Sequence, residues 1–169
     1  MARDQPGRSL AVALAVAAAA WGAPLAAQAP GVGSAAPVIA VHDLDGKPVD
    51  LGEWIGRRPV FLEFWATWCT SCEALQPAVR AAQAAYGSQV EFVGINVTVG
   101  EQRDSVRAWV AREAPPWHTL YDDEGASQRA YDVAATSYVV IIDRTGRIVY
   151  TGLGGSQSFD AALRRVTAQ

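Results

Sequence analysis

The chain has 169 residues, of which 50% are hydrophobic and 18% are charged, so it has enough apolar side chains for a real core and enough charge for a soluble surface. The formal net charge of -3 leaves no excess of basic residues, and we expect no nucleic acid among its partners. One compact domain is the expectation for the mature protein.

The first 29 residues have the composition of a signal peptide. Arg3 and Arg8 precede an uncharged stretch of mostly alanine, valine and leucine. The strongly apolar part, residues 10–20, is short compared with the about 20 residues that a membrane-spanning helix needs. We therefore expect residues 1–29 to be removed on export rather than kept as a membrane anchor.

Small residues at the end of this segment allow cleavage after Ala27 or after Ala29. The second position would place Pro30 directly after the cut, which is unfavourable. The folded domain is expected at residues 30–169, without stable membrane insertion after cleavage. Its predicted location is the oxidising environment of a bacterial periplasm or cell envelope.

The mature chain begins with a predicted hairpin. Apolar residues lie on both sides of Asp45-Gly46, a dipeptide that suits the positive dihedral angles of a tight turn. A short connector leads to residues 60–65, whose continuous apolar run predicts a central strand buried on both faces.

Strands and helices alternate in the rest of the chain. Helices are predicted at residues 70–85, 101–114, 125–131 and 158–168, and strands at residues 90–97, 119–121, 138–143 and 147–151. This order indicates an α/β fold with a partly parallel sheet that is covered on both faces.

The only two cysteines of the chain, Cys69 and Cys72, follow the predicted buried strand and stand at the start of the helix at residues 70–85. Unpaired backbone N–H groups and the helix dipole stabilise a thiolate at a helix N-terminus, and the thiolate is the reactive form of cysteine. The spacing therefore predicts a redox dithiol with Cys69 as its nucleophile.

Several stretches resemble the thioredoxin superfamily, specifically its exported TlpA/ResA-like branch. The most specific is Phe-Trp-Ala-Thr-Trp-Cys-Thr-Ser-Cys at residues 64–72, with Pro77 five positions further on. The lead hairpin, a Tyr-Asp-Val segment beginning at Tyr131, and Ile-Asp-Arg-Thr-Gly-Arg-Ile-Val at residues 142–149 also match. The resemblance covers roughly residues 31–155.

The resemblance implies a thioredoxin-like fold, with a mixed central sheet flanked by helices and an N-terminal β-hairpin extension. It also implies thiol–disulfide exchange with protein substrates, more often as a reductant, without a cofactor and with a membrane electron donor to keep the protein reduced. Cys69 would attack the substrate disulfide, and Cys72 would resolve the mixed disulfide and leave a Cys69–Cys72 bond. Trp68 would help to shape the surface that docks the substrate.

Glu63 is an acid in the middle of the apolar run, where a carboxyl group is costly to bury. It matches the position at which many thioredoxins carry a buried acid, and a carboxyl with a raised pKa there would take the proton from Cys72 as a proton relay. The alternative is that Glu63 faces a solvent gap or pairs with Lys47 or an arginine.

The chain departs from the family in the loop that faces the dithiol. The family usually has a cis-proline there, and Thr136-Ser137 stands at that position in this sequence. Because a cis bond before a non-proline residue costs about 3 to 4 kcal/mol, we expect a trans bond. Ser137 would then bring an N–H and a hydroxyl close to Cys69, and both Thr136 and Ser137 would take part in substrate docking.

Three outcomes of this departure remain open. Exchange persists with altered docking, activity is degraded, or the dithiol becomes a non-catalytic module that binds a metal ion or a partner. Leu75 stands where some reductive members carry a glutamate, which counts against a dedicated role in cytochrome c maturation.

No metal site is expected elsewhere in the sequence. His42 and His118 would complete a four-ligand set with the two cysteines, but they are far apart in sequence and are predicted in surface turns. Three adjacent acids beginning at Asp122 are interpreted as a solvated turn and helix start.

Overall fold

The computed structural model describes Met1 and residues 29–168. The expected signal peptide at residues 1–29 therefore lies outside the described residues except at its two ends. In the described part, no helix is both long enough and apolar enough to cross a membrane.

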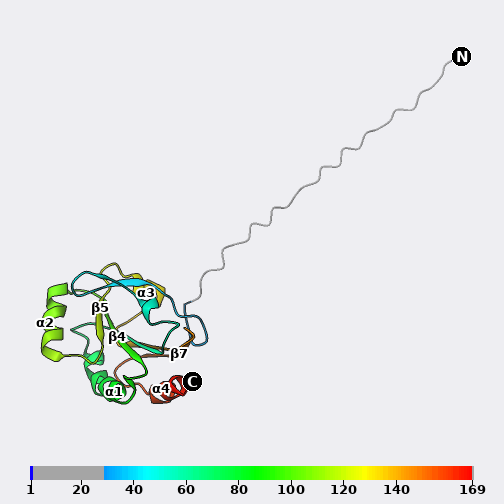
Figure 1. Ribbon diagram of the computed structural model, residues 1–169. Helices are drawn as coiled ribbons and strands as arrows, with labels where there is room; N and C mark the ends of the chain where they lie inside the picture. The colour runs from blue at the N-terminus through cyan, green and yellow to red at the C-terminus, as the bar shows by residue number, and fades with distance from the viewer. Residues whose placement is uncertain (2–28, 169) are drawn as a thin grey trace.

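Residues 29–168 contain seven strands and four α-helices. Figure 1 shows their arrangement. The strands are β1 (Ala40–Asp43), β2 (Pro48–Asp50), β3 (Val60–Trp65), β4 (Glu91–Asn96), β5 (His118–Tyr121), β6 (Tyr138–Ile142) and β7 (Ile148–Leu153). The helices are α1 (Thr70–Tyr86), α2 (Arg103–Glu113), α3 (Ala126–Ala130) and α4 (Asp160–Thr167), and a short 3-10 helix spans Leu51–Glu53. The predicted elements are all present, and their ends differ from the predicted bounds by at most two residues.

All seven strands form one mixed sheet in the order β2-β1-β5-β4-β3-β6-β7. The pairs β3·β4 and β4·β5 are parallel, and the remaining pairs are antiparallel. The predicted mixed sheet is thus confirmed, and the predicted N-terminal hairpin extends it through β1 and β5. Strand β3 lies near the centre, and all six of its residues are buried, as the apolar run predicts.

Alternate residues of β3 point to opposite faces of the sheet. Phe61 contacts Phe159 at the start of α4, with ring centroids 5.2 Å apart, and Trp65 contacts Trp109 of α2 at 4.5 Å. Glu63 lies between Phe61 and Trp65, so its side chain points to the same face. Helices α1 and α4 lie side by side there (Figure 1).

Helix α3 and the residue after it cover part of the opposite face of the sheet. Phe64 points to this face and contacts Tyr131, directly after α3, with ring centroids 5.4 Å apart. The connection from β5 to β6 carries α3 and joins two strands that run in opposite directions. The contact between Phe64 and Tyr131 therefore places the end of α3 on the face opposite to Phe61 and Trp65.

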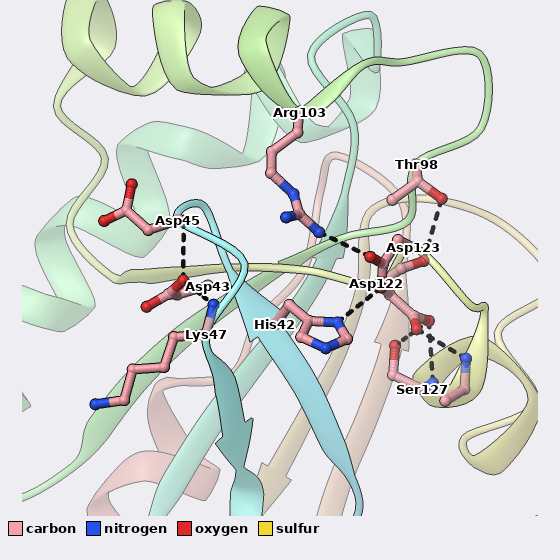
Figure 2. Close-up of polar contacts among 10 residues, drawn as sticks. His42, Asp43, Asp45, Lys47, Thr98, Arg103, Asp122, Asp123 and Ser127 are labelled. Atoms are coloured by element: carbon pink, nitrogen blue, oxygen red, sulfur yellow. Dashed lines mark hydrogen bonds and ion pairs between the residues drawn. The ribbon is translucent and has the colours of Figure 1, made fainter.

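The N-terminal hairpin is held against the α2 side of the molecule by charged groups. Asp123 accepts from Arg103 at 2.7 Å and lies 2.8 Å from His42 Nδ1, as Figure 2 shows. Gly46 has a φ of 84° in the hairpin turn, and a Cβ there would lie 2.8 Å from the Arg103 guanidinium. The turn therefore needs glycine for its backbone angle, whereas the flexible Arg103 side chain can shift to make room for a Cβ.

The lead-in before the hairpin lies along the edge strand β7. Gly33 N–H donates to the Ile148 carbonyl at 2.8 Å, and Ile148 N–H donates to the Ser34 carbonyl at 2.9 Å. Ala35 pairs with Arg147 in an isolated antiparallel bridge. These contacts cover the first part of an edge that would otherwise expose backbone donors and acceptors.

Candidate active site

Cys69 and Cys72 form a disulfide at the N-terminus of α1, with Cα atoms 5.2 Å apart. Cys69 is the N-cap residue of this helix, and its sulfur accepts the Cys72 backbone N–H at 3.0 Å. The same N–H would stabilise a thiolate on Cys69 after reduction, together with the positive end of the helix dipole. This geometry fits the predicted nucleophile.

Cys69 and Cys72 are only 6% and 4% exposed, and a cleft reaches both of them. The cleft has a volume of about 510 Å³ and lies between α1 and α2. Both cysteines line it, together with the indole rings of Trp65 and Trp109. The rest of the lining is mainly polar and includes the charged side chains of Glu73, Arg80, Arg112 and Glu113.

Glu63 is fully buried, and neither of its carboxyl oxygens has a hydrogen-bond partner among the described residues. Burial in this apolar setting raises the pKa of Glu63 from 4.5 to about 8. The alternative in which Glu63 faces a solvent gap or pairs with Lys47 or an arginine is therefore wrong. The carboxyl lies on the face of β3 that α1 covers, and its pKa allows it to gain or lose a proton near neutral pH.

A second acid, Glu101, holds the loop that leads to the cysteines. Glu101 is 8% exposed, and its Oε1 accepts the Thr67 backbone N–H at 2.9 Å and also the Thr67 hydroxyl. Its Oε2 accepts the Asn96 amide at 2.6 Å. Because Thr67 stands two positions before Cys69, these bonds fix the backbone that presents the disulfide.

Sequence reasoning missed this role of Glu101, which was predicted as the first residue of a helix. An acid is common in the first turn of a helix, so nothing in the local pattern marks Glu101 as different. In the structure its side chain turns inward to Thr67, and α2 begins only at Arg103.

Further hydrogen bonds connect the loop after β4 to the start of α3. Thr98 donates its hydroxyl to the Asp122 carbonyl at 3.1 Å, as Figure 2 shows. The Asp122 carboxylate accepts the N–H groups of Ala126, Ser127 and Gln128 at 2.7 to 3.1 Å, and also the Ser127 hydroxyl. The predicted turn and helix start are present, and Asp123 and Glu124 are exposed, but the prediction is wrong for Asp122, whose carboxylate is buried and bonds the start of α3.

Trp68 lies directly before Cys69, and 53% of its surface is exposed to solvent. Its indole N–H donates to the Val99 carbonyl at 2.8 Å, so one edge of the ring is fixed on the loop after β4. Val99 is itself exposed, so the residue that holds the Trp68 ring is also an exposed apolar one. This placement is compatible with the predicted docking role of Trp68.

Ser137 stands at the start of β6, on the strand next to β3. No peptide bond among the described residues is cis, so the bond between Thr136 and Ser137 is trans as expected. The Ser137 N–H donates to the Phe64 carbonyl at 2.8 Å, so it is engaged with the backbone of β3. The Ser137 hydroxyl is buried and has no partner among the described residues.

The histidines lie away from the cysteines. His42 is in β1 and His118 is in β5, where its Nε2 lies 3.4 Å from Glu91, so the prediction of surface turns is wrong for both. Within residues 29–168, no group of three or more His, Cys, Asp or Glu side chains is arranged to hold a metal ion.

Comparisons with known proteins agree with this geometry. The Redoxin family matches residues 31–164. The thiol-disulfide oxidoreductase ResA of Geobacillus thermodenitrificans is 32% identical over 118 residues, which cover 69% of this chain and 66% of that protein. The ResA of Geobacillus kaustophilus is 30% identical over 138 residues, which cover 80% of this chain and 78% of that protein.

A solved structure has the same fold. It is assigned as a thiol:disulfide interchange protein DsbE from Chlorobium tepidum and matches with a TM-score of 0.68 and 26% identity, over 80% of this chain and 94% of that one. The family match covers most of the chain, and both cysteines lie inside the matched region. The chain therefore belongs to the redoxin family, and it is an oxidoreductase of the ResA-like branch of the thioredoxin superfamily.

Proposed function

We propose that the protein is an exported thiol–disulfide oxidoreductase that reduces disulfides in protein substrates. The observation that carries the proposal is the Cys69–Cys72 pair at the N-terminus of α1, on the face of the sheet where Glu63 is buried without a partner. The names of the ResA relatives support the same chemistry.

The reaction proceeds in two exchanges. The Cys69 thiolate attacks one sulfur of the substrate disulfide, forms a mixed disulfide, and releases the other substrate sulfur as a thiolate. The Cys72 thiol then gives its proton to the ionised form of Glu63 and attacks the Cys69 sulfur. This step releases the second substrate thiolate and leaves the Cys69–Cys72 bond, so two electrons have passed to the substrate.

Substrate docking involves Trp68 and Thr136, and Ser137 takes part by holding the backbone beside Thr136, since Ser137 itself is buried. Thr136 forms no backbone hydrogen bond among the described residues, so its N–H and C=O are free to pair with an extended segment of substrate. A dithiol donor in the membrane would return Cys69 and Cys72 to the reduced state.

Two measurements test the function together. We expect the purified protein to catalyse insulin reduction by dithiothreitol, and its Cys69–Cys72 couple to have a reduction potential below about -200 mV, on the reducing side of the known range. A potential near about -120 mV would indicate an oxidant instead. No turnover, together with one metal ion bound per reduced protein, would favour the non-catalytic dithiol module.

Export is the part of the proposal that rests on residues 1–29 alone. We propose cleavage after Ala27 or Ala29 and release of a domain that spans residues 30–169 into the periplasm or envelope. Mass spectrometry of the protein recovered from that compartment should find an N-terminus at Gln28 or Pro30. An intact Met1 on membrane-bound protein would show that the segment is retained as an anchor.

A further inference from the structure

Ser137 has a backbone conformation that is rare for its residue type. Its φ is 62°, in the left-handed region that side chains other than glycine seldom occupy, and the residue is fully buried. A residue persists in this region only when its surroundings hold it there. The contacts of Ser137 therefore indicate what maintains the shape of the docking loop in the absence of proline.

Three hydrogen bonds fix both sides of the Ser137 backbone. Its N–H donates to the Phe64 carbonyl at 2.8 Å, and its carbonyl accepts the Gly154 N–H at 3.0 Å. The same carbonyl also accepts the side-chain amide of Gln157 at 2.9 Å. Two of these partners are backbone groups, so Gln157 is the side chain that holds this residue in place.

The amide of Gln157 has a defined orientation. Its Nε2 donates a second hydrogen bond to the Gly154 carbonyl at 2.7 Å, and its Oε1 lies 3.2 Å from the Tyr150 hydroxyl, which donates to it. A Cβ on Gly152 would lie 2.3 Å from Gln157 Oε1 and 2.4 Å from the Tyr150 hydroxyl. Glycine at position 152 therefore leaves the space that this amide fills.

The segment that carries Gln157 also contacts the helix of the dithiol. A Cβ on Gly155 would lie 2.9 Å from both the Ser71 carbonyl and the Ala74 side chain, so the backbone after β7 packs directly on the first turn of α1. Gln157 thus connects the docking loop at Ser137 to a segment that contacts Ser71, one of the two residues between the cysteines.

We propose that Gln157 is a positioning residue for substrate docking, an inference that rests on the proposed function. Its amide holds the Ser137 carbonyl and thereby sets the direction of Thr136, whose backbone pairs with the substrate. In relatives with a cis-proline the ring constrains the loop covalently. In this chain a glutamine hydrogen bond takes that role, and the loop depends on a side chain remote from the dithiol.

Replacing Gln157 with alanine or methionine tests the inference. Methionine has a similar volume but no donor, so it keeps the packing and removes the hydrogen bonds. For both variants we expect the KM for insulin to rise fivefold or more, because the docking edge is no longer held. The kcat, and the rate with the small disulfide 5,5′-dithiobis(2-nitrobenzoate), should stay within twofold of the wild type.

Gln83→Ala is the matched control, because Gln83 is a half-buried glutamine in the last turns of α1. Thermal melting shows whether each variant is folded. If the alanine variant is unfolded, the KM of the methionine variant tests the inference. An unchanged KM in the methionine variant would overturn the inference, as would an equal loss of rate with insulin and with the small disulfide. A wild type that reacts with the small disulfide but not with insulin would refute the proposed function itself.

Discussion

Replacing Cys69 with serine is expected to abolish insulin reduction, with a loss of at least about 10³-fold, because no other thiol in the chain can start the exchange. Replacing Cys72 with serine should also stop turnover, but by a different route. Attack by Cys69 still occurs in that variant, and the mixed disulfide then persists because the resolving thiol is missing.

The two variants are distinguished on a non-reducing gel after reaction with oxidised insulin. Cys72→Ser should give a covalent adduct that dithiothreitol removes, and Cys69→Ser should give none. The Cys69 sulfur accepts the Cys72 N–H at the start of α1, so Cys69 is the sulfur that this helix end activates. An adduct that forms with Cys69→Ser and not with Cys72→Ser would reverse the two roles.

Replacing Glu63 with glutamine is expected to flatten the dependence of stability on pH. The pKa of Glu63 is about 8 in the folded protein, against 4.5 for an unburied carboxyl group, so the folded state holds a proton that the unfolded state releases. The stabilisation from this neutral carboxyl is complete below pH 4.5 and is lost as pH rises through about 8. Over that interval the free energy of unfolding should fall by up to about 1.4 kcal/mol per pH unit.

Urea denaturation of the oxidised protein between pH 5 and about pH 9 measures this slope without titration of the thiols. Glu63→Gln should match the wild type near pH 5 and be more stable than it near pH 8. Glu73→Gln, a change to an exposed acid in α1, is the control and should keep the wild-type slope. Equal slopes for Glu63→Gln and the wild type would mean that Glu63 is ionised when buried.

The same substitution tests the proton relay. Glutamine cannot accept the Cys72 proton, so oxidation of the reduced dithiol by a disulfide should slow and lose its pH dependence near neutrality. The quantity to measure is the rate of disulfide formation followed by tryptophan fluorescence after mixing. Unchanged rates from pH 6 to about pH 9 would leave Glu63 as a structural acid only.

The parts of the site that the sequence predicts are those encoded within a few residues. Cys69 and Cys72 are three positions apart, and Glu63 interrupts an apolar run, so each is visible in the local pattern. The same holds for the hairpin at Asp45-Gly46 and for the buried strand β3, because both depend on turn chemistry and hydrophobic periodicity.

The supporting contacts are not local, and sequence reasoning did not find them. Glu101 reaches Thr67 across 34 positions, and Gln157 reaches Ser137 across 20. Glutamate before a helix and glutamine in a loop are both ordinary in a sequence, so their roles become visible only when the sheet brings the segments together.

The lead-in segment along β7 limits where the proposed signal peptide can be cleaved without damage to the fold. Its backbone hydrogen bonds begin with the Gly31 carbonyl, which accepts the Ser34 N–H at 3.0 Å. Both expected cuts, after Ala27 and after Ala29, fall upstream of that carbonyl and leave the edge of the sheet intact. A signal peptidase that errs by a residue or two is therefore tolerated. A protease that cuts beyond Ser34 would remove the hydrogen bonds along β7. The strand would then be an exposed sheet edge that can pair with a second molecule.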